Sequence, residues 1–282
     1  RLLLGTGVYK DLLKQRQALA EAATPATILS CLRLNAELIK LSDHQDFYLD
    51  PHTKHYTGEK NVLKGWVGAL GRVDKAIHSD FIHTSNGYPA YFETTDNYLD
   101  LRDRIFTFLD RFRTELQFAE NSILTFVIDR GIFSAETFKE FIASKHIHII
   151  TWEKNYQPGE WSADGPADGQ FQLLRKRNNS TDLRTYSFSY RDGRWQKDKE
   201  MRRIIVRATN PKGRTIEVAI LTDDCNRPCQ EIIELIFNRW LQENDFKYME
   251  KHFGINQITS YKAISYDSLR DELEEKKITG GH

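Results

Sequence analysis

The sequence has few cysteines and no long apolar run. Its three cysteines, Cys31, Cys225 and Cys229, exclude a disulfide-stapled scaffold and fit a reducing compartment. Cys225 and Cys229 have no second Cys or His pair at zinc-finger spacing, so two incidental thiols are the better interpretation. No stretch approaches the ~18–20 apolar residues that a membrane helix needs, so we expect no membrane-spanning segment. The sequence also has no internal repeat and no low-complexity tract.

The chain has 282 residues, of which 40% are hydrophobic and 28% charged. These ordinary globular values exclude global disorder, and the length suits one large domain or a core domain that carries an insertion. The apolar opening at residues 2–4 is too short for a signal-peptide core. Because the sequence does not begin with Met, we expect it to be a fragment of a longer protein.

The overall charge is balanced, but it is unevenly distributed along the chain. Forty basic residues face forty acidic ones in total, whereas residues 170–215 contain thirteen basic and four acidic residues. A block with an excess of nine positive charges is typical of a segment that meets a polyanion. A solvated basic β-surface without a partner explains the same count equally well.

The first half of the chain alternates between helix and strand patterns. Thr24 and Pro25 are typical of a helix N-cap followed by Pro at the first helical position, and they predict a helix to about Leu41. Period-two alternation and short apolar runs indicate strands, and 3–4 spacing of apolar residues indicates helices. The predicted strands are at 47–49, 75–83, 122–128 and 146–152, and the predicted helices at 96–117 and 134–144.

The second half changes character at Lys154. Gly and Pro turns separate short alternating runs up to about Thr222, which predicts an antiparallel β region, and a helix follows over about 228–251. Without that β region, the order of elements is that of the ribonuclease H fold. We therefore predict an α/β fold, with a ribonuclease H-like mixed sheet and flanking helices, interrupted by an antiparallel β insertion.

The predicted organisation has four parts. They are a helical N-terminal segment at 1–44, a ribonuclease H-like catalytic core at 45–153 and 223–262, a β-rich insertion at 154–222, and a charged C-terminal tail at 263–282.

Three acidic residues are candidates for chemistry. Asp50 and Asp129 each close a predicted strand, and site residues of α/β sheets lie at such ends. Glu243 lies on or beside the apolar stripe of the late helix. Its neighbours at i−4 and i+4, Arg239 and Lys247, allow a simple salt-bridge ladder as the alternative to metal ligation. If the three carboxylates converge, they can hold two Mg²⁺ ions for phosphodiester chemistry.

At this point the chain resembles a known family. Residues 47–58, 127–133 and 238–249 resemble the three acid motifs of DDE-class insertion-sequence transposases, whose ribonuclease H core is interrupted by a β-rich insertion before the final Glu. The second motif fits Asp-x-Gly-x-aromatic, and the third fits Arg-x-x-x-Glu. The resemblance implies that Asp50, Asp129 and Glu243 bind two Mg²⁺ or Mn²⁺ ions and catalyse strand cleavage and strand transfer at transposon ends.

The resemblance also implies a set of DNA contacts. The family's lysine falls seven residues after the Glu, where this chain has Glu250, so Lys247 or Lys251 must take that role beside Arg239. Related transposases stack a flipped base on an aromatic residue of the insertion, which makes Trp161 and Trp195 candidates. Packing of each Trp inside a hairpin is the alternative. Arg175, Lys176 and Arg177 are the basic cluster that we expect to meet phosphates.

Three functions remain open from the sequence. The first is a metal-dependent transposase, or its catalytic fragment, that acts on double-stranded DNA as a homodimer in the prokaryotic cytosol, without a membrane partner. The second is a ribonuclease H-like nuclease or resolvase, which cuts but does not join. The third is a non-catalytic remnant that binds DNA through the same fold and its basic insertion.

Overall fold

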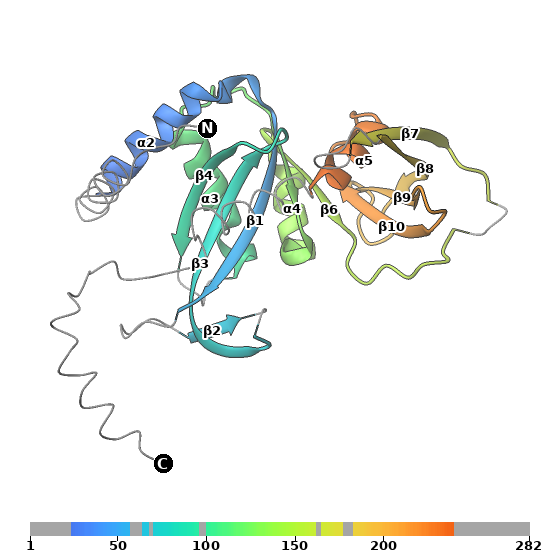
Figure 1. The fold of residues 1–282 in the computed structure, drawn as a ribbon, viewed down its shortest axis with the longest axis horizontal. Helices are drawn as coiled ribbons and strands as arrows, with labels where there is room; N and C mark the ends of the chain where they lie inside the picture. The colour runs from blue at the N-terminus through green and yellow to red at the C-terminus, as the bar shows by residue number, and fades with distance from the viewer. Residues whose placement is uncertain are drawn as a thin grey trace, which may run out of the picture.

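A computed structural model describes residues 24–56, 64–67, 70–95, 100–161, 165–176 and 183–239 (Figure 1). These residues form a mixed α/β structure with one large mixed sheet and four α-helices. No helix within these ranges is long and apolar enough to cross a membrane. The predictions for residues 1–23 and for the tail at 263–282 lie outside the described residues.

The elements before residue 153 follow the predicted alternation. The strands are β1 (Asp46–His55), β2 (Lys64–Val67), β3 (Arg72–Thr84), β4 (Pro89–Thr95), β5 (Leu124–Ile128) and β6 (Ile147–Trp152). The helices are α2 (Pro25–Leu38), α3 (Leu101–Glu115) and α4 (Ala135–Ala143). Short 3₁₀ turns occur at Leu41–Asp43 and Arg130–Ile132. No strand had been predicted at the positions of β2 and β4.

Three of the helices begin where a polar side chain caps the first turn. The side chains of Thr24, Asp100 and Ser134 accept hydrogen bonds from backbone N–H groups of α2, α3 and α4, at 3.2, 2.9 and 3.0 Å. Thr24 was predicted as a cap, and Ser134 is the first residue of the helix predicted at 134–144. Helix α3 begins at Leu101, later than predicted, because Asp100 provides its N-cap.

The second half provides the rest of the sheet. The predicted antiparallel region consists of β7 (Gly169–Lys176), β8 (Leu183–Arg194), β9 (Arg202–Thr209) and β10 (Thr215–Thr222), and α5 (Cys229–Asn238) follows it. Strand β10 pairs antiparallel with β6, so these four strands extend the same sheet. Figure 1 shows β7–β10 at one end of the molecule and β1–β4 at the other.

The order and directions of the strands define the topology of the sheet. The sheet runs β2-β3-β1-β5-β6-β10-β9-β8-β7, and β4 pairs with β3 beside this path. Strand β5 is parallel to β1 and to β6, whereas β3 is antiparallel to both β1 and β4. The order β4-β3-β1-β5-β6 with these directions is compatible with a ribonuclease H-like fold.

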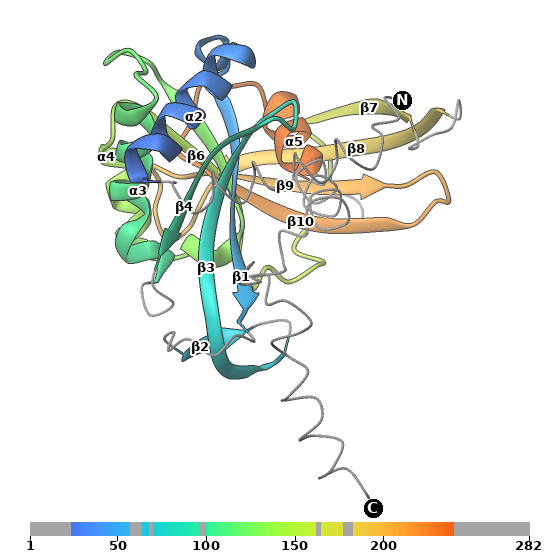
Figure 2. The ribbon, with the colours of Figure 1, turned by 60° about the vertical axis from the view of Figure 1, so that its left-hand side comes forward.

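The two faces of the sheet have separate cores, because alternate residues of a strand point to opposite sides. On one face, Phe47 and Leu49 of β1 pack with the buried side of α3, including Phe112, whose ring centroid is 5.2 Å from that of Phe47. On the other face, Tyr48 packs with Ile232, Ile233 and Ile236 of α5. Figure 2 shows α2, α3 and α4 together on one side of β1 and β3, away from α5.

A buried ion pair joins the sheet to α3. Asp80 of β3 is fully buried, and its carboxylate accepts two hydrogen bonds from Arg104 of α3, including one at 3.0 Å from Nη2. Burial lowers the pKa of the Arg104 guanidinium, because desolvation penalises its charged form. This pair lies on the α3 face, and therefore on the face of the sheet opposite to α5.

The first strand is longer than the sequence predicted, and Asp50 does not close it. Strand β1 continues past Pro51 to His55, because β3 pairs with it as far as His55 and Ala76. Only the parallel pairing with β5 ends before Asp50, after Leu49 and Ile128. Pro51 lies beyond the last β1–β5 pair, where no described strand adjoins β1 on that side, and such a position tolerates the missing N–H of proline.

Candidate functional site

Two of the predicted acidic residues meet where β1 and β5 separate. The last pair in the β1–β5 register is Leu49 with Ile128, so Asp50 and Asp129 are the next residues of two adjacent parallel strands. The carboxylate of Asp129 accepts a hydrogen bond from the Arg130 N–H at 2.8 Å, which fixes it at the start of a 3₁₀ turn. The Asp50 side chain is 25% exposed and that of Asp129 is 45% exposed.

The guanidinium of Arg239 lies between these two carboxylates. Its Nη1 is 3.5 Å from Oδ1 of Asp50, and its Nη2 is 3.5 Å from Oδ2 of Asp129. Arg239 is the C-cap of α5, and its side chain is only 16% exposed. One positive charge therefore lies close to two negative charges that come from different strands.

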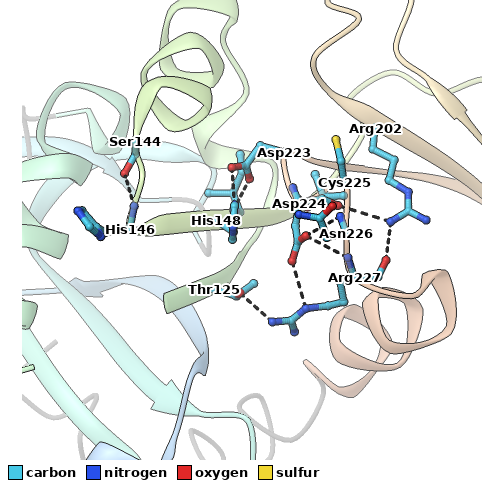
Figure 3. Close-up of polar contacts among 12 residues, drawn as sticks. Thr125, Ser144, His146, His148, Arg202, Asp223, Asp224, Cys225, Asn226 and Arg227 are labelled. Carbon is cyan, nitrogen blue, oxygen red and sulfur yellow. Dashed lines mark hydrogen bonds and ion pairs between the residues drawn. The ribbon is translucent and has the colours of Figure 1, made fainter. Parts of the chain in front are cut away.

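Helix α5 reaches this position because its two ends are tied to opposite ends of the parallel strands. Just before the helix, Arg227 donates to Asp46 at 2.6 Å, at the amino end of β1. It also donates to Thr125 at 3.0 Å, at the amino end of β5 (Figure 3). Along the helix, the Tyr48 hydroxyl donates to the Leu235 carbonyl at 3.0 Å. The last turn thereby comes over Asp50 and Asp129.

The loop between β10 and α5 is fixed by its own acidic residues. The Asp224 carboxylate accepts from the Asn226 and Arg227 N–H groups at 3.0 and 3.1 Å, as Figure 3 shows. Asp223 accepts from the Ile149 N–H at 2.8 Å and pairs with His148 at 2.8 Å. We did not predict this anchoring, although an acidic and Asn-containing turn directly before a helix is a recognisable capping signal.

His83 lies on the same face of the sheet as Tyr48, its partner in the β1–β3 register. Its side chain is fully buried, and burial lowers its pKa to about 4 because a charged imidazole is poorly solvated there. At neutral pH it is therefore an uncharged part of the core beside Phe81, whose ring centroid is 6.5 Å away.

This buried histidine predicts acid sensitivity. Its pKa is depressed in the folded state, so the unfolded chain binds the proton more tightly, and stability falls as the pH drops from about 6.5 towards about 4. Between pH 7 and pH 4.5, we expect a loss of about 2 kcal/mol from His83, as the shift implies. His83→Phe should reduce the fall in unfolding free energy, measured by urea denaturation at both pH values.

His148 provides a control of opposite sign. The hydrogen bond that His148 donates to the Asp223 carboxylate raises the pKa of His148, so the contribution of this pair to stability is present at low pH and is lost as the pH rises. His148→Gln should therefore cost more stability at pH 5 than at pH 8. Parallel pH profiles for the wild type and His83→Phe would show that His83 does not cause the acid sensitivity.

The two tryptophans of the predicted insertion are packed inside the protein. Trp161 and Trp195 are each 3% exposed. The Trp161 indole donates to the Gly165 carbonyl at 3.0 Å, and the Arg207 guanidinium lies 4.5 Å from its ring centroid. The Trp195 indole donates to Glu153 at 3.0 Å. In this conformation both rings have the packing role that was the alternative to base stacking.

Part of the basic block is neutralised within the chain. Arg203 pairs with Glu153 and Glu160 at 2.7 and 2.8 Å, and Arg207 pairs with Glu217 at 2.8 Å. All three acids lie outside residues 170–215. A charge count over those residues alone therefore includes the two arginines but leaves out their acidic partners. The excess of positive charge in this block is therefore smaller in space than along the sequence.

Two of the remaining predicted residues lie at the edge of the sheet, and four lie outside the described residues. Arg175 and Lys176 are the last two residues of β7, at the outer edge of the sheet. Arg177, Glu243, Lys247 and Lys251 lie outside the described residues. Within the part of the chain that is described, no three His, Cys, Asp or Glu side chains are grouped so that they could hold a metal ion.

Asp50 and Asp129 nevertheless suit a divalent cation. Carboxylate oxygens are the ligands that Mg²⁺ prefers. In the structure a cationic group already lies 3.5 Å from one oxygen of each residue, which shows that both can face a shared positive charge. Asp50 and Asp129 would hold such an ion from two adjacent strands, with a third ligand still required.

Comparisons with known proteins give little further information. The sequence matches no family model and no curated protein. Among solved structures, the chain is similar to the piggyBac transposase in a synaptic complex with hairpin DNA, with a TM-score of 0.42 and 8% sequence identity. The match covers 80% of this chain and 44% of that chain, so it spans less than half of the piggyBac chain. The function is therefore inferred from the site itself.

Proposed function

We propose that this chain is a metal-dependent DNA transposase that cleaves and joins strands, with Asp50, Asp129 and Glu243 as its carboxylate triad. One observation carries the proposal: Asp50 and Asp129 follow the last paired residues of two adjacent parallel strands, and both face one cationic group. Glu243 follows Arg239 by four residues, a spacing that predicts the same helix face.

The protein's own contribution is to hold these groups in place. The β1–β5 register fixes the spacing between Asp50 and Asp129, and the Arg130 N–H orients the Asp129 carboxylate. The anchor at Arg227 fixes the start of α5, which sets where the residues after it can lie. Two Mg²⁺ or Mn²⁺ ions, when bound, would stabilise the charge that develops on the attacking and leaving oxygens of a phosphodiester.

Cleavage and joining can be tested separately. The full 282-residue chain would be incubated with Mg²⁺ or Mn²⁺, a supercoiled plasmid, and a short labelled duplex that carries a free 3′ hydroxyl. Labelled plasmid indicates strand transfer and supports a transposase. Nicking without label transfer supports the ribonuclease H-like nuclease. Binding without either product supports the non-catalytic remnant.

Proposed DNA binding by the insertion predicts a particular salt dependence. Changing Arg175, Lys176 and Arg177 together to Gln removes up to three phosphate contacts. The slope of log affinity against log salt should become shallower by at most ~2.7, because each contact contributes ~0.9. Sequence preference should hardly change, since phosphate contacts position the DNA and do not specify its sequence. Fluorescence anisotropy with a duplex at several salt concentrations measures both.

A matched variant controls for the loss of net charge. Arg102, Arg111 and Lys139 are exposed residues of α3 and α4, on the face opposite to α5, and changing them to Gln also removes three positive charges. This control should leave the salt slope as it is. An unchanged slope in the correctly folded Arg175, Lys176 and Arg177 variant would remove that cluster from the DNA-binding surface.

A further inference from the structure

The contacts of Arg239 with Asp50 and Asp129 are long for charged hydrogen bonds. Both are 3.5 Å, whereas a strong N–H to carboxylate bond measures about 2.7–2.9 Å. Asp129 is also 45% exposed, so water competes for its oxygens. Long contacts of this kind, which water can reach at Asp129, are weak and easily exchanged, because solvent-accessible ion pairs contribute little net free energy.

The position of the guanidinium nevertheless has an electrostatic reason. Asp50 and Asp129 follow the last β1–β5 pair, so their like charges are held near each other by the backbone. Without a cation between them the two carboxylates would repel each other. Arg239 supplies that cation from the end of α5, which is itself held in place through Arg227.

We infer that Arg239 competes with the metal: its guanidinium is the counter-ion of Asp50 and Asp129 in the metal-free protein, and it has to leave these oxygens when a divalent ion binds. The inference rests on the proposed function, because it takes the two carboxylates as the metal ligands. It assigns Arg239 a positioning role, which offsets the repulsion between the two carboxylates and limits the affinity of the site for metal.

The reason for competition is geometric as well as electrostatic. Arg239 faces Oδ1 of Asp50 and Oδ2 of Asp129, and an ion shared by the two residues would have to lie between the same two carboxylates. A divalent ion and a guanidinium cannot both contact them closely, since the two cations repel each other at short range. The side chain of Arg239 is long and flexible, so it can move aside while the helix backbone stays in place.

The test measures Mn²⁺ affinity directly. The full chain would be titrated with Mn²⁺ alone, without DNA, and free Mn²⁺ would be followed by electron paramagnetic resonance. Arg239→Gln should bind Mn²⁺ about fivefold more tightly than the wild type, a change on the scale of a partly exposed charge pair. Arg239→Lys keeps the charge but loses the planar fork, and its affinity should lie between the two.

Two controls separate this competition from other effects. Arg111→Gln removes an arginine of α3 that pairs with Glu93, far from this site, and should leave Mn²⁺ affinity unchanged. In an Asp129→Asn background, Arg239→Gln should no longer raise the affinity, because the shared ligand is gone. Circular dichroism melting checks that each variant is folded.

The possible outcomes distinguish the inference from the proposed function. If the wild type and Arg239→Gln bind Mn²⁺ equally, and both need Asp129, the metal site stands and the competition is wrong. Weaker binding by Arg239→Gln would also overturn the competition, since Arg239 would then assist the metal. If no variant binds Mn²⁺ in a way that depends on Asp129, the proposed function fails and the inference fails with it.

Discussion

Asp129→Asn is expected to abolish DNA cleavage while leaving DNA binding intact. The substitution removes a negative ligand at the position where β1 and β5 separate. Metal ions contribute several kcal/mol to phosphodiester chemistry, and each 1.4 kcal/mol is tenfold in rate, so we expect a loss of about 100-fold or more. DNA affinity should be unchanged or slightly higher, because less negative charge faces a polyanion. Cleavage rates with Mg²⁺ and binding by anisotropy measure the two effects.

The substitution is conservative for the fold. Asn at position 129 still has an oxygen that can accept from the Arg130 N–H, and Asn is a good residue at such a cap. The control is Asp110→Asn, which removes an exposed carboxylate of α3 and should leave cleavage at the wild-type rate. If Asp129→Asn cleaved DNA with Mg²⁺ as fast as the wild type, Asp129 would not be a metal ligand.

The local patterns predicted most of the elements in the described part of the chain, because they depend on near neighbours. Caps at Thr24 and Ser134 and the buried stripe of α3 can be recognised from residues within a few positions of each other. The end of β1 was predicted wrongly at Asp50 for the same reason. Asp-Pro is a local turn signal, and pairing with β3 overrides it.

The contacts that position α5 could not be predicted in this way. Arg227 reaches Asp46 across 181 residues of sequence and Thr125 across 102. No periodicity connects such residues, and the partners are known only once β1, β5 and α5 are placed together. The pairing of Arg239 with Asp50 and Asp129 has the same origin. From the sequence, the ion-pair partner of Arg239 was expected four residues away, at Glu243.

Charge counts along the chain were misleading for a related reason. Arg203 and Arg207 belong to the basic block, but their partners Glu153 and Glu217 lie in the segments just before and after it. The turn between β9 and β10 and the segment after β6 bring these charges together. The net charge of a surface patch depends on which residues the fold brings together. The net charge of a stretch of sequence depends only on where the stretch begins and ends.

Arg104→Met is expected to destabilise the protein more than any other substitution considered for this chain. Asp80 is fully buried and Arg104 is 10% exposed, so removal of the arginine leaves a buried carboxylate without its main counter-charge. Breaking a buried pair in this way costs about 3–5 kcal/mol. Urea denaturation at pH 7 should show the lower unfolding free energy. The Asp50 and Asp129 site should be affected only through global stability, because the pair lies on the opposite face of the sheet.

A double variant shows whether the cost comes from the lost attraction or from the abandoned charge. Asp80→Leu with Arg104→Met removes both charges and replaces them with apolar groups in a position that already faces the α3 core. The attraction between two buried charges is largely offset by the cost of removing both from water. The unfolding free energy of the double variant should therefore lie within about 1 kcal/mol of that of the wild type. If the double variant were as unstable as Arg104→Met, the pair itself would stabilise the fold, and the contact between β3 and α3 would depend on attraction between charges more than on apolar packing.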